Sequence, residues 1–132
     1  MTEEQPPKRV LVVEDDFLNR LFFCDVLKEE GFEVEPVEDE REAVERTEAF
    51  RPDLIVMDIH MPHISGVEII KSLKANPSLS AIPVLAVTGY VGIGQERQVR
   101  DAGAGGYLPK PVSIAPFVAA VNKLIAPDAS SG

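Results

Sequence analysis

Residues 52–62 read PDLIVMDIHMP, a short apolar run that starts after a proline and ends on an acid. A proline such as Pro52 interrupts a helix, and residues 54–57 are apolar throughout instead of alternating with polar ones. Uniformly apolar strands are typical of a parallel sheet that is covered on both faces. We therefore predict a buried strand at residues 54–57, with Asp58 at its carboxyl end.

The same pattern, an apolar run followed by a polar group, recurs on both sides of this stretch. Residues 10–13 lead into Glu14, Asp15 and Asp16, residues 84–87 into Thr88, and residues 107–109 into Lys110. The carboxyl ends of parallel strands meet at one edge of the sheet, which is where open α/β folds bind ligands. Carboxylates, a hydroxyl and an ammonium gathered there would suit metal-assisted transfer of a phosphoryl group to a carboxylate.

Strands and helices alternate along the rest of the chain. We expect strands at residues 9–13, 32–36, 54–57, 82–87 and 106–108, and helices at 17–30, 40–50, 65–75, 93–102 and 113–126. Gly31 and Gly103 stand where two helices would end, and Asn76-Pro77 stops a third. This alternation favours right-handed βαβ units and a parallel sheet. The predicted fold class is α/β, a doubly wound (βα)5 fold with a five-stranded parallel sheet.

The size and charge of the chain exclude several classes of protein. Its 132 residues suit one domain at 8–126, between tails at 1–7 and 127–132 that we expect to be disordered. A net charge of −9 argues against a nucleic-acid surface, and no apolar stretch is long enough to span a membrane. Cys24 is the only cysteine, which excludes an internal disulfide and fits a reducing, cytoplasmic environment.

The acidic cluster after the first strand has two explanations. Glu14, Asp15 and Asp16 repel one another unless a cation neutralises them, and oxygen ligands of this kind suit Mg²⁺. Alternatively, Asp15 or Asp16 caps the helix that starts at Phe17, and the other acids are solvated. Both explanations can hold at once, since Asp16 can cap the helix while its neighbours bind a metal.

The other strand-end groups also have two explanations each. Asp58 would either attack phosphorus or form a turn, and Thr88 would either donate to a phosphoryl oxygen or simply belong to a strand. Lys110 would be a phosphate clamp or a surface lysine, and a cis bond to Pro111 would direct it inward. Complementary groups at four strand ends together favour phosphoryl chemistry.

These motifs resemble those of the response-regulator receiver domains of two-component signalling. The resemblance covers residues 8–126 and rests on VVEDD at 12–16, DLIVMD at 53–58, MP at 61–62, SG at 65–66, VTG at 87–89 and GGYLPKP at 105–111. The 30 residues from Asp58 to Thr88 and the 22 from Thr88 to Lys110 match the spacing in that family. The resemblance implies the flavodoxin-like strand order 2-1-3-4-5. Within the family, the chain resembles stand-alone, single-domain receivers of the cell-cycle and stress type.

The resemblance implies a metal site at the acidic cluster. Asp15, Asp58 and the backbone carbonyl of His60 would bind Mg²⁺ directly, and Glu14 would act through a water molecule. Asp16 lies one position beyond the acidic pair of the family, so we assign it no metal role.

The resemblance also implies how the phosphoryl group is held. Asp58 would be the phosphoacceptor, Lys110 would form an ion pair with the phosphoryl group, and Thr88 would donate a hydrogen bond to it. Tyr107 would be the switch aromatic, which moves inward when Thr88 moves toward the phosphate. A two-state switch of this kind requires a charged group with different contacts in each state.

The segment before the fourth helix is rich in glycine. Gly89, Gly92 and Gly94 lie before residues 95–98, which are polar and which we expect to be exposed. With few apolar anchors, this segment should be among the least stable in the chain. We expect phosphorylation to change the surface formed by residues 89–102, 106–108 and 113–126.

Two bulky residues stand near the expected phosphate. His60 and Tyr90 lie two positions beyond Asp58 and Thr88, where the family tunes the access of water to the acyl phosphate. We therefore expect slow autodephosphorylation.

The first helix is unusually apolar and includes Phe17, Leu18, Leu21, Phe22, Phe23, Cys24, Val26 and Leu27. A buried stripe needs only three or four positions in two turns. Either the helix is deeply packed, or part of it is exposed and docks a helix of a histidine-bearing four-helix domain, with Arg20 beside the contact.

The function implied is that of a response regulator that signals to protein partners or passes its phosphoryl group on. A histidine kinase or histidine phosphotransfer protein and a downstream protein effector would be its partners, without nucleic acid or membrane. The protein would be a monomer or weak dimer and would have no separate enzymatic substrate. A haloacid-dehalogenase phosphatase is one alternative, but it needs an acid where His60 stands. A pseudo-receiver that binds without phosphorylation is another, and it would not need the complete set of groups.

Overall fold

The computed structural model describes residues 6–89 and 92–125. The elements follow in the order β1 (Arg9–Val13), α1 (Phe17–Glu29), β2 (Glu33–Val37), η1 (Glu40–Glu42), α2 (Ala43–Phe50), β3 (Leu54–Asp58), α3 (Gly66–Ala75), β4 (Val84–Thr88), α4 (Gln95–Ala102), β5 (Gly106–Pro109) and α5 (Ile114–Ile125). The described residues form a five-stranded sheet in the order β2-β1-β3-β4-β5, with every pairing parallel. The predicted fold class and strand order are confirmed.

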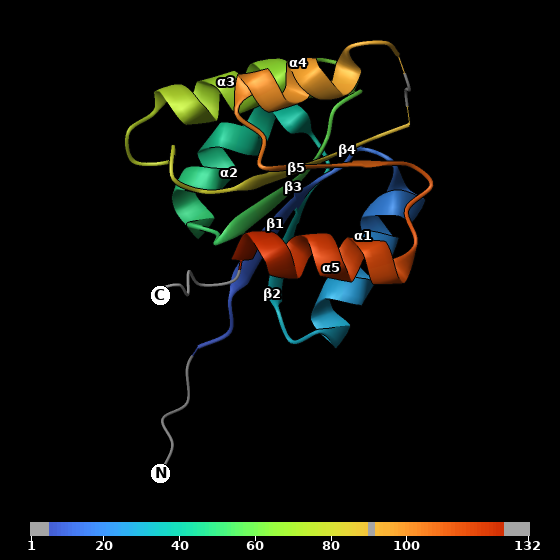
Figure 1. Ribbon diagram of the computed structural model, residues 1–132. Coiled ribbons are helices and arrows are strands. Elements are labelled where there is room, and N and C mark those ends of the chain that lie inside the picture. Colours follow the sequence, from blue (N-terminus) through green and yellow to red (C-terminus); the bar gives the residue numbers. More distant parts are fainter. Residues whose placement is uncertain (1–5, 90–91, 126–132) are drawn as a thin grey trace, which may run out of the picture.

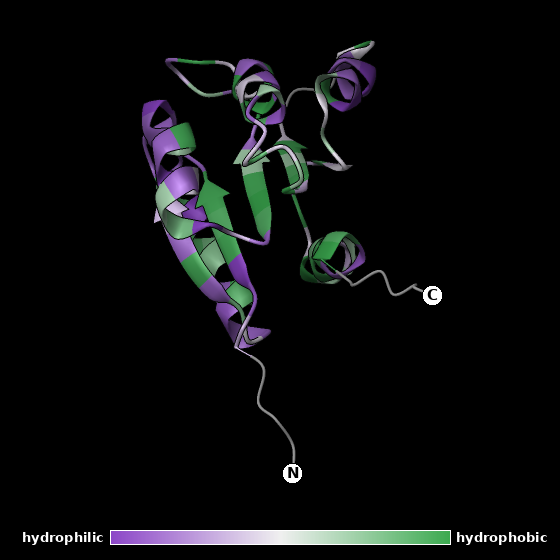
Figure 2. Ribbon diagram, turned by 90° about the vertical axis from the view of Figure 1, so that its left-hand side faces the viewer, coloured by the Kyte–Doolittle hydropathy of each residue, from purple (hydrophilic) through white to green (hydrophobic). Residues whose placement is uncertain are grey.

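The sheet lies between two layers of helices (Figure 1). The helices α2, α3 and α4 cover one face, and α1 and α5 cover the other. Alternate strand residues enter two separate cores: Ile55 and Met57 pack on the α2 side, whereas Leu54 and Val56 pack on the α1 side. Figure 2 shows the apolar colouring concentrated on the strands between these layers. The apolar runs are uniform because both of their faces are buried.

The strand ends lie level at the carboxyl edge of the sheet. Val13 of β1 pairs with Met57 of β3, and Asp58 pairs with Val87 of β4. Residues that directly follow these pairs therefore reach the same edge, as the parallel arrangement predicts.

The helix termini follow local sequence signals. Asp16 caps α1, since its carboxylate accepts the backbone N–H of Asn19 at 2.9 Å. Ser65 caps α3 by accepting the N–H of Val67 at 3.1 Å. Gly31 follows α1 with a φ of +94°, in the left-handed region that favours glycine.

Three predicted elements begin two or three residues too early, each for a local reason, and the other boundaries within the described residues differ by one residue at most. The fourth strand begins at residue 84 and not at 82, because Pro83 has no N–H for the sheet ladder. The fourth helix begins at 95 and not at 93, because Gly94 has a φ of +82°. The helix predicted at 40–50 starts with the 3-10 turn η1. Within the part of the chain that the structure describes, no helix is long and apolar enough to cross a bilayer.

Candidate functional site

Acids from two neighbouring strands meet at the carboxyl edge of the sheet. Glu14 directly follows β1 and Asp58 ends β3, and their side chains are 1% and 5% exposed. Asp15 is exposed beside them, and carboxylate oxygens of the three residues lie within 4.8 Å of one another. The backbone fixes Glu14, whose N–H donates to the Val37 carbonyl at 3.1 Å. The acids predicted as metal ligands are thus brought together.

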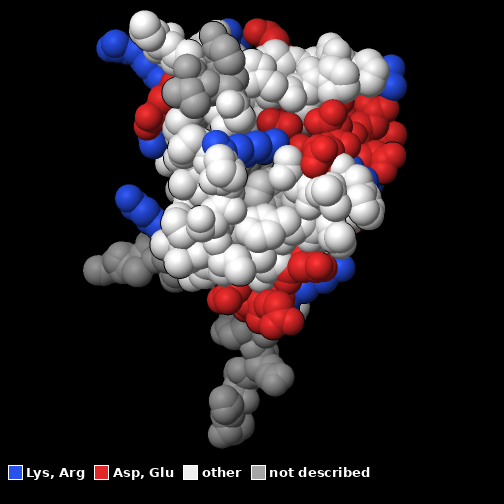
Figure 3. Space-filling model, turned by 90° about the vertical axis from the view of Figure 1, so that its right-hand side faces the viewer, with Lys and Arg blue, Asp and Glu red and all other residues white. Residues whose placement is uncertain are grey.

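Lys110 reaches into this acidic group from the end of β5. Its Nζ lies 3.1 Å from Glu14 Oε1 and 3.4 Å from Asp58 Oδ2. The Lys110 N–H donates to the Thr88 carbonyl at 2.8 Å, and the bond to Pro111 is cis. Figure 3 views this edge of the molecule and shows acidic side chains gathered on one side, with basic atoms beside them.

The carboxylates outnumber the ammonium in this group, so negative charge is in excess. Burial, and next the charge of Asp58, raise the pKa of Glu14 from its usual 4.5 to about 7. Burial lowers the pKa of Lys110, but the carboxylates of Glu14 and Asp58 outweigh this effect and raise that pKa overall. A divalent cation would neutralise the excess charge, and a donor set made only of oxygens suits Mg²⁺. The residues present therefore fit a magnesium site.

Thr88 and Tyr107 lie on the same face of neighbouring strands. Thr88 ends β4, is fully buried and pairs with Pro109. Tyr107 pairs with Ala86, and both pack in the core on the α2 side of the sheet. Residues two apart on a strand share a face, so Thr88 points to the same side as Tyr107. Burial and then the charge of Glu96 raise the pKa of the half-buried Tyr107 hydroxyl.

Comparisons with known proteins agree with this geometry. The family model described as response regulator receiver domain matches residues 10–122. The chain belongs to this family. The receiver is 38% identical over 119 residues to the polar-differentiation response regulator DivK of Brucella anthropi, covering 90% of this chain and 97% of that one. It is 36% identical over 118 residues to DivK of Brucella ovis, with 89% and 96% covered.

Solved structures share the fold of this receiver. The chemotaxis protein CheY4 of Vibrio cholerae matches with a TM-score of 0.84 at 27% identity, over 89% of this chain and 98% of that one. A CheY-like response regulator receiver domain protein from Methanospirillum hungatei matches with a TM-score of 0.82 at 28% identity, over 90% and 94%. These matches favour a receiver over the phosphatase, whose second acid is replaced by His60 in this chain.

His60 is exposed but contacts the start of α4. Its N–H donates to Asp58 Oδ1 at 3.2 Å, and its ring Nε2 lies 3.3 Å from Gln95 Oε1. The prediction that Gln95 is exposed is wrong, since the residue is only 7% exposed. His60 lies 35 residues away in sequence, and its ring gives the buried amide oxygen of Gln95 a hydrogen-bonding partner. Tyr90, the other bulky residue of the prediction, lies outside the described residues.

The apolar residues of α1 divide between core and surface, so the helix is deeply packed on one side and exposed on the other. Phe23, Cys24 and Leu27 are buried. Phe17, Leu18 and Leu21 are 62%, 71% and 45% exposed. A shallow groove of about 210 Å³ runs along this exposed side, lined by Phe17, Arg20, Leu21, Cys24, Asp25, Lys28 and Pro36.

Proposed function

We propose that Asp58 accepts a phosphoryl group from a phosphohistidine of a histidine kinase or histidine phosphotransfer protein. The observation that carries this proposal is the position of Asp58, a buried strand-end carboxylate 3.4 Å from the Lys110 ammonium. One carboxylate oxygen would form the new bond to phosphorus as the bond from phosphorus to the histidine nitrogen breaks. The products are an acyl phosphate on this receiver and a free histidine on the donor.

The acidic residues around Asp58 would serve the metal. Asp15, Asp58 and the backbone carbonyl of His60 would hold Mg²⁺ directly, and Glu14 would hold it through water. When bound, the ion would neutralise charge on the phosphoryl group and on the attacking carboxylate. Lys110 already contacts Glu14 and Asp58, so it can pair with a phosphoryl group on Asp58 without a change in its backbone.

Thr88 would transmit phosphorylation to the surface that partners read. Its hydroxyl would donate to the phosphoryl group, and its movement would leave room for Tyr107, which faces the same side of the sheet. The surface formed by α4, β5 and α5 would then change and be read by a downstream protein. Signalling of this kind needs no separate substrate.

The exposed side of α1 is the surface that we assign to the phosphoryl donor. Phe17, Leu18 and Leu21 lie on the helix that begins two residues after Asp15. An apolar surface next to a reactive group suits a partner helix that carries the phosphohistidine. Arg20 lies beside it, with its guanidinium 5.7 Å from the centre of the Phe17 ring.

Phosphorylation by acetyl phosphate tests the proposed function. Wild type in Mg²⁺ should gain the mass of one phosphoryl group, and Asp58→Asn should gain none. Asp53→Asn, a matched change just before the same strand, should be labelled like wild type. Excess EDTA should prevent the labelling of wild type and of Asp53→Asn. Equal labelling of wild type and Asp58→Asn would contradict the proposal.

A further inference from the structure

Glu40 is a buried acid that takes no part in the phosphorylation site. Among the described residues, the buried acids are Glu14, Asp58 and Glu40, and Glu40 is 2% exposed. A buried charge is expensive unless partners satisfy it. The partners of Glu40 therefore indicate why a charge is kept at this position.

The partners of Glu40 belong to the loop that follows the phosphoacceptor. Glu40 Oε2 accepts the backbone N–H of Ile64 at 2.9 Å and also the backbone N–H of His63. The His63 ring Nδ1 lies 3.2 Å from the same oxygen. Burial raises the pKa of Glu40, but the N–H groups of Ile64 and His63 outweigh it and hold that pKa below its usual value. Glu40 thus stays a carboxylate that accepts hydrogen bonds from the loop.

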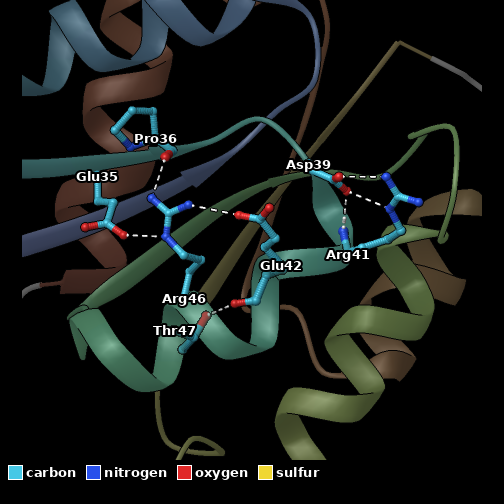
Figure 4. A network of polar contacts seen from close by, with 8 residues as sticks. Glu35, Pro36, Asp39, Arg41, Glu42, Arg46 and Thr47 are labelled. Carbon is cyan, nitrogen blue, oxygen red and sulfur yellow. Dashed lines mark hydrogen bonds and ion pairs between the residues drawn. The ribbon is translucent and has the colours of Figure 1, made fainter.

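The turn that carries Glu40 has polar contacts of its own. Asp39 accepts the Arg41 backbone N–H at 3.0 Å and pairs with its guanidinium at 2.8 Å. The Arg46 guanidinium lies 3.1 Å from a carboxylate oxygen of Glu42 in η1 and 2.8 Å from a carboxylate oxygen of Glu35 in β2 (Figure 4). The Arg46 contacts link η1 to β2 and α2, and the Asp39 contacts close the turn itself, so Glu40 stands on a turn that is joined to two neighbouring elements.

Among the described residues, hydrogen bonds between backbone groups hold the loop at residues 59–65 only near its two ends. The Ile59 N–H donates to the Val87 carbonyl at 3.0 Å, and the Gly66 N–H donates to the Ile59 carbonyl at 2.9 Å. Between these ties, the His60 N–H and ring contact Asp58 and Gln95, and Glu40 holds His63 and Ile64. His60, whose carbonyl is a metal ligand under the proposed function, lies in this loop.

We propose that Glu40 is a positioning residue of the metal site. Its carboxylate holds His63 and Ile64 and thereby restricts the path of the loop after His60, which in turn orients the His60 carbonyl. This inference rests on the proposed function, because it assigns that carbonyl to Mg²⁺. The role is distinct from a purely stabilising one, since it predicts a change in metal affinity that other losses of stability do not produce.

Titration with Mg²⁺ alone, followed by amide chemical shifts, tests the proposal on the full chain. Glu40→Leu removes the acceptor and should raise the Kd for Mg²⁺ about tenfold, as loss of a group that orients a metal ligand does. Glu40→Gln keeps a carbonyl oxygen for the two N–H groups and should raise that Kd less than about threefold. If Glu40→Leu does not fold, Glu40→Ser takes its place with the same expectation.

Thr47→Val is the matched control. It removes a fully buried hydroxyl on α2, the helix that follows η1, which donates to the Ala43 carbonyl at 2.7 Å (Figure 4). It should lower the free energy of unfolding and leave the Kd for Mg²⁺ unchanged. Equal Kd values for wild type and Glu40→Leu would overturn the positioning role and leave the proposed function intact. A wild type that binds no Mg²⁺ would contradict both.

Hydrogen exchange of the metal-free protein provides a second readout. In Glu40→Leu, the amides of His63 and Ile64 should exchange at least about tenfold faster, since they lose their acceptor. Thr47→Val should leave these two amides protected as in wild type. Unchanged protection in Glu40→Leu would overturn the positioning role.

Discussion

Replacing Glu14 with glutamine should stabilise the metal-free protein relative to wild type, by an amount that increases as the pH rises. Burial and the charge of Asp58 raise the pKa of Glu14 to about 7 in the folded protein, against its usual 4.5. The folded state therefore binds this proton more tightly than the unfolded chain does. The free energy of unfolding falls as the pH rises through this interval, because the unfolded chain loses the proton first.

The size of the effect follows from the same two values. The pKa of Glu14 rises from 4.5 in the unfolded chain to about 7 in the folded protein. At 1.36 kcal/mol per pH unit, this rise adds about 3 kcal/mol to the free energy of unfolding at low pH. Of this, about 2 kcal/mol should be lost between pH 5.5 and pH 8. Glu14→Gln has no proton to lose, so its stability relative to wild type should increase by that amount over this range.

Urea denaturation followed by circular dichroism, in EDTA at pH 5.5 and pH 8, measures this difference. Glu29→Gln is the control, because Glu29 is exposed at the end of α1 and water solvates its carboxylate in both states. A stability difference between Glu14→Gln and wild type that is the same at both pH values would refute the reasoning. Saturating Mg²⁺ should remove most of the loss in wild type at pH 8, since the cation neutralises the buried acids.

Other changes test separate parts of the structure. A Cβ on Gly66 would lie 2.8 Å from the Asp58 carbonyl oxygen, so Gly66→Ala should lower the free energy of unfolding by about 1–3 kcal/mol in urea titrations. Leu18→Asp should slow phosphoryl transfer from a phosphohistidine donor about tenfold while labelling by acetyl phosphate stays unchanged. Equal slowing of both reactions would exclude a docking role for Leu18. His60→Ala should shorten the half-life of the acyl phosphate, and a half-life equal to that of wild type would show that His60 does not restrict water.

The strands and the gathering of strand-end groups were predictable because they depend on local patterns. A run such as residues 54–57 is apolar on both faces whatever its partners are, so the strand can be assigned without them. Once the strands are parallel, their ends must meet, and Asp58 and Lys110 follow from that topology. The cap at Asp16 is equally local, since it needs only the next turn of the chain.

Two contacts were not predictable, because each depends on a loop that is distant in the sequence. Gln95 and Glu40 both stand at the start of a helical segment, where polar side chains are usually solvated. Their burial depends on His60 and on the N–H groups of His63 and Ile64, all in the loop between β3 and α3. The path of that loop is a property of the folded chain, and no periodicity in the sequence encodes it.

Locating the phosphoryl group after phosphorylation tests the central claim most directly. Wild type labelled in Mg²⁺ would be fragmented in a mass spectrometer, and the position of the added phosphoryl mass would be assigned along the chain. The group should lie on Asp58, at the end of the sequence LIVMD. A phosphoryl group on His60, His63 or any other residue would contradict the account.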